Sequence, residues 1–91
     1  MIAVMGDCHG FWAGIEYLNT FDLPDDFILL QVGDFGFYPN TLKTWKPPKF
    51  PVYAIDGNHE NHEYLSQFTS DVNEVAENLY YIRRGAVLEF D

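Results

Sequence analysis

Three short apolar runs, each leading into a glycine and a polar residue, constrain the fold of this chain more than any other feature. The runs cover residues 2–5, 27–32 and 51–55, and they lead into Gly6-Asp7, Gly33-Asp34 and Asp56-Gly57-Asn58. Continuous apolar runs of this length are typical of strands buried on both faces of a parallel sheet. The segments between them are long enough for the crossovers that parallel strands need. The sequence therefore predicts an α/β fold with a parallel-sheet βαβ core.

Two helices and a hairpin are expected around this core. Residues 11–21 have the pattern of an amphipathic helix, whose apolar positions are Trp12, Ile15, Leu18 and Phe21. A short helix is expected over residues 60–68, and its inward-facing side chains are Tyr64, Leu65 and Phe68. Residues 79–82 and 86–90 are predicted as two strands of a C-terminal β-hairpin that turns at Gly85.

Composition indicates a single domain over residues 1–91 with a well-filled core, since 47% of residues are hydrophobic. Fourteen acidic residues against five basic ones give a net charge of −9. This charge argues against binding anionic membranes, and against nucleic acid except as a phosphodiester substrate. It favours divalent cations. A single cysteine, no signal-peptide pattern and no apolar run of membrane-spanning length predict a cytoplasmic protein.

The polar residues that follow the three runs are predicted to converge, because parallel strands end at one edge of a sheet and open α/β sheets carry their sites there. The converging set is Asp7, His9, Asp34, Asn58 and His59. Hard oxygen and imidazole donors of this kind suit manganese, iron, zinc or magnesium.

Three other interpretations compete with a metal centre. Cys8 lacks the arginine that a cysteine phosphatase loop places about six residues downstream, and the first arginine is Arg83. His59 and His62 are three residues apart rather than four, so the zinc-protease HExxH pattern is not met. Glycine and aspartate after a strand can also form turns alone, but three such endings in succession argue against turn chemistry as the whole explanation.

The three endings resemble the first three signature motifs of calcineurin-like metallophosphoesterases. GDCHG at residues 6–10 matches the form GDxHG, GDFG at 33–36 matches GDxG, and GNHE at 57–60 matches GNHE or GNHD. They occur in family order and after the expected strands. The resemblance implies the first half of the family's four-layer αββα sandwich.

The resemblance also implies roles residue by residue. Asp7 and His9 match ligands of a first metal, Asp34 matches the carboxylate that bridges two metals, and Asn58 matches a ligand of the second. His59 matches the histidine that contacts phosphate or protonates the leaving oxygen. The implied activity is hydrolysis of phosphate mono- or diesters by a metal-activated water, with one or two ions, Mn²⁺ foremost and Fe, Zn²⁺ or Mg²⁺ as alternatives.

The chain departs from the family pattern in lacking its later histidine motifs. The histidines are His9, His59 and His62, so metal ligands supplied by the family's second half are missing. A homo-oligomer or a separate second half would cover the apolar sheet surface that half a sandwich exposes. The alternative function is a catalytically inactive metal-binding or partner-binding module. Arg83 and Arg84 are expected to flank the turn at Gly85, with a phosphate-holding role left open.

Overall fold

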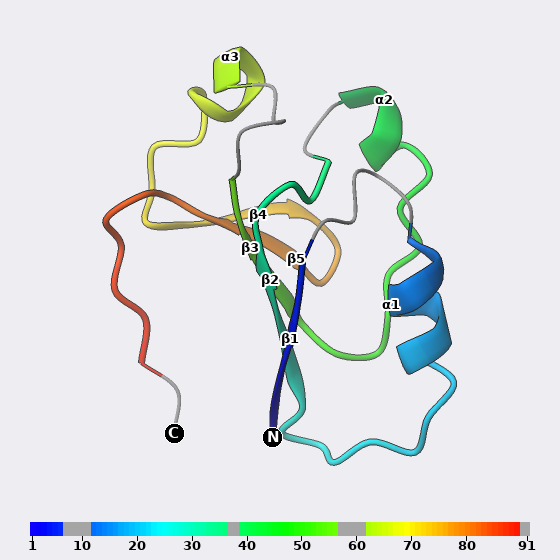
Figure 1. The fold of residues 1–91 in the computed structure, drawn as a ribbon. Helices are drawn as coiled ribbons and strands as arrows, with labels where there is room; N and C mark the ends of the chain where they lie inside the picture. The colour runs from blue at the N-terminus through cyan, green and yellow to red at the C-terminus, as the bar shows by residue number, and fades with distance from the viewer. Residues whose placement is uncertain (7–11, 37–38, 57–61, 90–91) are drawn as a thin grey trace.

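The structure, a computed structural model, describes residues 1–6, 12–36, 39–56 and 62–89 of the 91. The strands in this part are β1 (Ile2–Met5), β2 (Ile28–Val32), β3 (Val52–Ile55), β4 (Val72–Ala76) and β5 (Leu79–Ile82). The helices are α1 (Ala13–Leu18), α2 (Pro39–Leu42) and α3 (His62–Leu65) (Figure 1). Of the described helices, none has the length and apolar character needed to cross a membrane.

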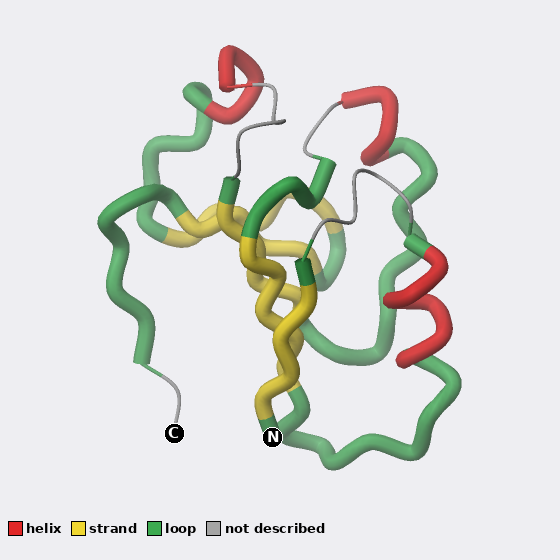
Figure 2. Tube along the Cα trace, viewed as in Figure 1, coloured by secondary structure: helices red, strands yellow, loops and turns green. Residues whose placement is uncertain are grey.

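The strands form one mixed sheet in the order β1-β2-β3-β5-β4. β1, β2, β3 and β5 are mutually parallel, and β4 pairs antiparallel with β5. The parallel βαβ core predicted from the three apolar runs is thus confirmed, and the strand bounds agree within one residue at each end. Figure 2 shows the strands together, with the helices on one side and at one end.

A β-hairpin is present near the C-terminus, but its strands are not the ones predicted. β5 matches the expected residues 79–82, whereas its hairpin partner is β4, which precedes it. The two strands are joined at Glu77-Asn78, and Asn78 takes a left-handed conformation with φ 57°, which asparagine tolerates better than most residues. Residues 86–89 form no strand. Gly85, with φ 86°, does sit in a turn, closed by a hydrogen bond from the Ala86 amide to the Arg83 carbonyl (3.1 Å).

The two predicted helices are shorter than their patterns. α1 ends at Leu18, and Phe21, expected on its inward face, is 43% exposed. α3 covers only residues 62–65 of the expected 60–68 among those described. Leu65 is buried, and Tyr64 and Phe68 pack against the core as predicted.

The core lies on one face of the sheet. It is built from Leu29 on β2, Val52 and Ala54 on β3, and Leu79 and Tyr81 on β5. Trp12, Ile15, Phe27, Phe35, Phe50 and Leu65 cover these strands. α1 and the long connection between α2 and β3 lie on this side in Figure 1.

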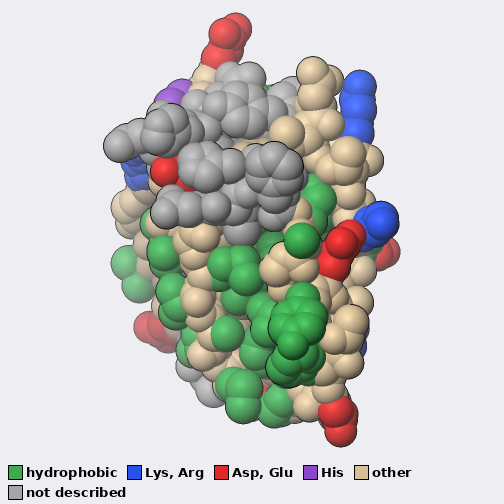
Figure 3. All heavy atoms as spheres, turned by 45° about the vertical axis from the view of Figure 1, so that its right-hand side comes forward, with side chains coloured by type: hydrophobic (Ala, Val, Ile, Leu, Met, Phe, Trp, Pro, Cys, Tyr) green, Lys and Arg blue, Asp and Glu red, His purple; other side chains and the backbone are tan. Residues whose placement is uncertain are grey.

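The opposite face of the sheet is largely uncovered. Ile2, Val4, Val32 and Ile55 are between 42% and 65% exposed. The prediction that the strands are buried on both faces is therefore wrong for this chain, because its described helices pack on one side. Hydrophobic side chains are exposed elsewhere too: Figure 3, which brings the right-hand side of Figure 1 forward, shows them gathered across the lower part of that view. A homo-oligomer or a separate second half stays a prediction for this face.

Candidate metal and phosphate site

Three neighbouring parallel strands end at one edge of the sheet. Met5 at the end of β1 pairs with Gln31, and Val32 at the end of β2 pairs with Ile55 at the end of β3. The strand ends are therefore level within about one residue. The chain leaves β1 at Gly6, β2 at Gly33 and β3 at Asp56, all at the same edge, which is the top of the sheet in Figure 1.

Asp34 is the predicted metal ligand that the structure describes. It is half-buried and has a left-handed backbone with φ 50°, between Gly33 (φ 112°) and Phe35. Non-glycine residues rarely adopt this conformation, and aspartate is among those that do so most readily. The backbone thus turns sharply where β2 ends, which gives the carboxylate a defined position at the edge of the sheet.

The turn before Asp34 is held by Gln31, the buried polar side chain of β2. Gln31 is 1% exposed, its Nε2 donates to the Gly33 carbonyl (2.7 Å), and its Oε1 accepts from the Gly33 amide (3.1 Å). Buried backbone polar groups need partners, and this one amide satisfies two of them. Gln31 therefore fixes the backbone immediately before the predicted ligand.

The other side of Asp34 is anchored in the core. Phe35 is fully buried, and its ring centroid lies 4.8 Å from that of Trp12 and 5.9 Å from that of Trp45. One residue further, the Gly36 carbonyl accepts a 2.6 Å hydrogen bond from the Thr41 hydroxyl on α2. The Phe35 ring therefore belongs to the core. The GDFG segment is thus held at Gly33 by Gln31 and at Gly36 by Thr41.

Asp56 is a buried carboxylate between β3 and the third motif. Its side chain is 3% exposed, and Oδ2 accepts a hydrogen bond from Arg84 Nε at 2.8 Å. His62 Nδ1 lies 3.4 Å from the same oxygen, and the Tyr81 hydroxyl lies 3.5 Å from Oδ1. A buried charge is tolerated when it is paired and hydrogen-bonded. Asp56 therefore joins β3, α3 and the turn after β5 at the sheet edge.

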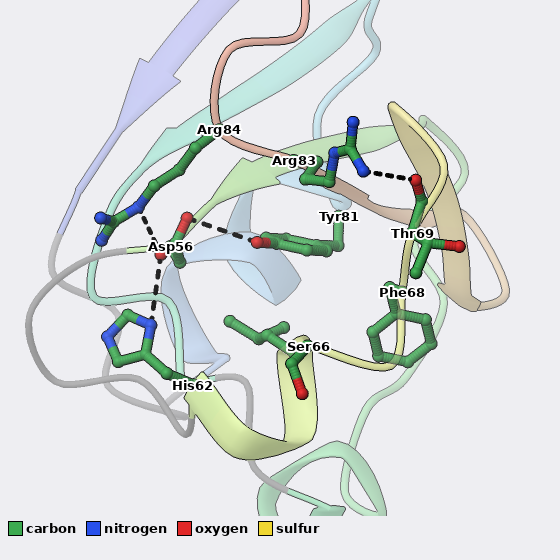
Figure 4. A pocket seen from close by; sticks show the side chains of 9 residues that line it. Asp56, His62, Ser66, Phe68, Thr69, Tyr81, Arg83 and Arg84 are labelled. Atoms are coloured by element: carbon green, nitrogen blue, oxygen red, sulfur yellow. Dashed lines mark hydrogen bonds and ion pairs between the residues drawn. The ribbon is translucent and has the colours of Figure 1, made fainter.

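A pocket of about 290 Å³ opens beside Asp56 (Figure 4). Polar groups come from Asp56, His62, Ser66, Thr69, Arg83 and Arg84, and apolar walls come from Leu65, Phe68 and Tyr81. Burial raises the pKa of the Tyr81 hydroxyl above its usual value, and the charge of Asp56 raises it further. The hydroxyl consequently stays protonated and able to donate to Asp56.

The remaining predicted site residues lie outside the described part of the chain. These are Asp7, His9, Asn58 and His59, and Cys8 of the first motif also lies there. Within the described ranges, no group of three or more His, Cys, Asp or Glu side chains is arranged to hold a metal ion. Asp34 carries a carboxylate, a hard oxygen donor of the kind that divalent cations bind.

Two supporting residues were missed or only partly predicted. Gln31 was included in an apolar run, although an amide inside a buried strand two residues before a glycine indicates a side chain that binds the backbone. Asp56 was included only in the polar ending of the third apolar run, and its pairing with Arg84 was not predicted. The two residues are 28 positions apart, so no local pattern links them.

A family model described as calcineurin-like phosphoesterase matches residues 1–89. This match covers nearly the whole chain, including all three motifs and every described strand. No curated protein and no solved structure matches the chain.

Proposed function

The chain belongs to the calcineurin-like phosphoesterase family, and from this membership we propose that it hydrolyses phosphate mono- or diesters with the help of divalent metal ions. The family is one of metal-dependent phosphoesterases. The observation that carries the proposal is the position of Asp34, half-buried and left-handed at the level ends of three parallel strands that lead into the three motifs. Open α/β sheets use this edge for their active sites.

The residues proposed to hold metal are Asp7, His9, Asp34 and Asn58. Carboxylate, imidazole and amide oxygen donors suit Mn²⁺, with Fe, Zn²⁺ or Mg²⁺ as alternatives. When bound, such ions supply a Lewis acid that activates water and offsets the charge of the phosphate. A net charge of −9 otherwise repels an anionic ester, so the acidic residues at this edge need that compensation before substrate can approach.

His59 is the proposed catalytic residue. An imidazole beside the reacting phosphate can donate a hydrogen bond to it or a proton to the leaving oxygen, since its ordinary pKa lies near neutrality. Other residues support the site by holding the backbone next to it. Gln31 and Thr41 fix the backbone around Asp34, and Asp56 fixes the end of β3 from which the third motif begins.

The test is a pair of measurements on the 91-residue chain: Mn²⁺ binding by calorimetry, and hydrolysis of a chromogenic aryl phosphomonoester and phosphodiester with and without Mn²⁺. Asp34→Asn is the informative variant, because asparagine also tolerates φ 50° and the change removes charge rather than backbone geometry. Asp26→Asn is the matched control, since Asp26 is exposed and precedes β2 at the opposite end of that strand.

We expect Mn²⁺-dependent hydrolysis that Asp34→Asn lowers by about 100-fold or more, as for loss of a catalytic electrostatic group, and that Asp26→Asn leaves unchanged. If the parent chain shows no turnover but binds Mn²⁺ more tightly than Asp34→Asn does, the result would instead favour the alternative function, a metal-binding module without catalysis. Equal Mn²⁺ binding by the parent and Asp34→Asn would contradict both.

A further inference from the structure

The two arginines of the chain, Arg83 and Arg84, are adjacent but differently engaged. Arg83 is used within the fold: Nη1 donates to the Thr69 carbonyl (2.7 Å), and Nη2 lies 3.6 Å from an Asp71 carboxylate oxygen. Its amide also donates to the Asp71 carbonyl. These contacts tie the end of β5 to the segment before β4, so Arg83 has a structural role.

Arg84 is held at one atom and open at the others. Its Nε donates to buried Asp56, while the side chain as a whole is 70% exposed. No described residue binds its two terminal amino groups. A guanidinium fixed through Nε keeps the paired N–H groups of Nη1 and Nη2 for a planar, bidentate contact, the geometry that matches phosphate oxygens.

The position of Arg84 is set by the turn at Gly85 and by the ion pair. The turn closes between Arg83 and Ala86, which places Arg84 at its second residue. Figure 4 shows the guanidinium beside Asp56, on the side of that carboxylate away from Tyr81. Asp56 directly follows β3, one of the three strands whose ends form the candidate site, so Arg84 lies at this same edge of the sheet.

We propose that Arg84, oriented by Asp56, binds the phosphate group of the ester. This inference rests on the proposed function and adds a substrate-binding residue to it. An arginine held in place before the ligand arrives loses less freedom on binding than a mobile one. The pocket of about 290 Å³ that Arg84 borders has room for the organic part of an ester.

The test uses inorganic phosphate and the metal-free chain, so it does not depend on turnover. With two arginines, the chain gives two side-chain Nε–H signals in a ¹H–¹⁵N spectrum, and the Arg83→Gln and Arg84→Gln variants assign them. Phosphate is titrated with EDTA present and then, in a separate sample without EDTA, with diamagnetic Mg²⁺. We expect phosphate to shift the Arg84 signal and not that of Arg83. Arg84→Gln should weaken phosphate binding about tenfold, the loss of a charge-assisted contact.

Arg83→Gln is the matched control, because it removes the same charge one residue away, and it should change phosphate affinity less than about twofold. Arg84→Lys should recover only part of the affinity, since lysine cannot form the bidentate contact. Equal binding by the two Gln variants, or an Arg84 signal that phosphate does not move, would overturn the proposal. A chain that binds phosphate through Arg84 but never hydrolyses an ester would contradict the proposed function alone. Mn²⁺-dependent hydrolysis that is unaffected by Arg84→Gln would contradict the Arg84 proposal alone.

Discussion

The side-chain amide of Gln31 binds both backbone polar groups of Gly33, two residues ahead on the same chain. The Nε2–carbonyl distance is 2.7 Å and the amide–Oε1 distance is 3.1 Å, and Gln31 is 1% exposed. The pair closes a small ring that holds the chain in its turn out of β2, immediately before Asp34. Because both bonds are shielded from water, neither has a solvent substitute.

Gln31→Leu should destabilise the protein and loosen the predicted metal site together. Leucine fits a similar volume but leaves the Gly33 amide and carbonyl without their partner, which costs about 2–5 kcal/mol of unfolding free energy. Chemical denaturation measures the loss, and calorimetry should show weaker Mn²⁺ binding. Gln67→Leu is the control, because Gln67 is exposed and its side chain donates to the carbonyl of nearby Tyr64. Equal destabilisation by the two variants would show that the Gln31 bonds add nothing specific.

The position of the site could largely be predicted from the sequence, but the contacts that hold it in place could not. Apolar runs ending in Gly-Asp and Gly-Asn were sufficient to predict three parallel strands with level ends, because strand burial and strand ends leave local patterns. The contacts that brace the site are different. Asp56 and Arg84 come from separate elements, and their 2.8 Å contact depends on β5 lying beside β3. That β3 and β5 are neighbours follows from the strand order of the sheet, which no local sequence pattern reveals.

Gly85→Ala should lower stability although no atom stands in the way of a methyl group. A Cβ at this position meets nothing within 4 Å, but φ is 86°, a conformation that an L-residue adopts only with strain. We expect a loss of about 1 kcal/mol, read as a lower Tm. A variant with unchanged Tm would mean that the turn after β5 relaxes freely.

Gly14→Ala should raise the stability of the protein, whereas Gly85→Ala should lower it. Gly14 lies inside α1, where alanine is favoured over glycine by about 0.5–1 kcal/mol. The new Cβ would lie 3.2 Å from the Met5 Cε, the flexible end of a side chain that can shift. Thermal unfolding should therefore show a raised Tm for Gly14→Ala. A fall in Tm would indicate that Met5 is held rigidly at the end of β1.

Stability should decline as the pH rises above about 10, in part because of Tyr81. Burial and the nearby Asp56 charge hold the pKa of Tyr81 above its ordinary 10.0, and the arginines offset this only in part. The unfolded chain therefore loses this proton first. The stabilisation is complete below pH 10 and is lost as pH rises through the folded-state pKa. Tyr80 adds to the decline, because burial and Glu74 also raise its pKa.

The measurement is the unfolding free energy of Tyr81→Phe against pH, with Tyr17→Phe as the exposed control. Phenylalanine has no proton to lose, so the decline above pH 10 should be shallower in Tyr81→Phe, with the Tyr80 part remaining. The control should follow the parent curve. A decline as steep in Tyr81→Phe as in the parent would contradict the assignment.

Two features of the fold were the least predictable from the sequence: which strands form the hairpin, and the burial of the sheet on one face. Residues 72–76 alternate weakly, and the turn that pairs them with β5 depends on Asn78 rather than on the more conspicuous Gly85. The apolar runs resembled strands buried on both faces, since apolar composition does not reveal which face a helix covers. Val4 on β1 is 65% exposed and Val52 on β3 is 0% exposed, although both belong to strands of one sheet.

Val4→Ala and Val52→Ala form a matched pair that tests this asymmetry. Both remove the same two methyl groups from a strand, so the difference between them isolates burial. Val52→Ala should cost about 2–3 kcal/mol, because it leaves a cavity in the core, whereas Val4→Ala should stay within about 0.5 kcal/mol. Denaturation is best followed at several protein concentrations. Val4→Ala would contradict this expectation if its loss of unfolding free energy approached that of Val52→Ala and grew with protein concentration. Truncating a valine costs this much only where the side chain is buried, so the result would mean that this sheet face is covered in solution.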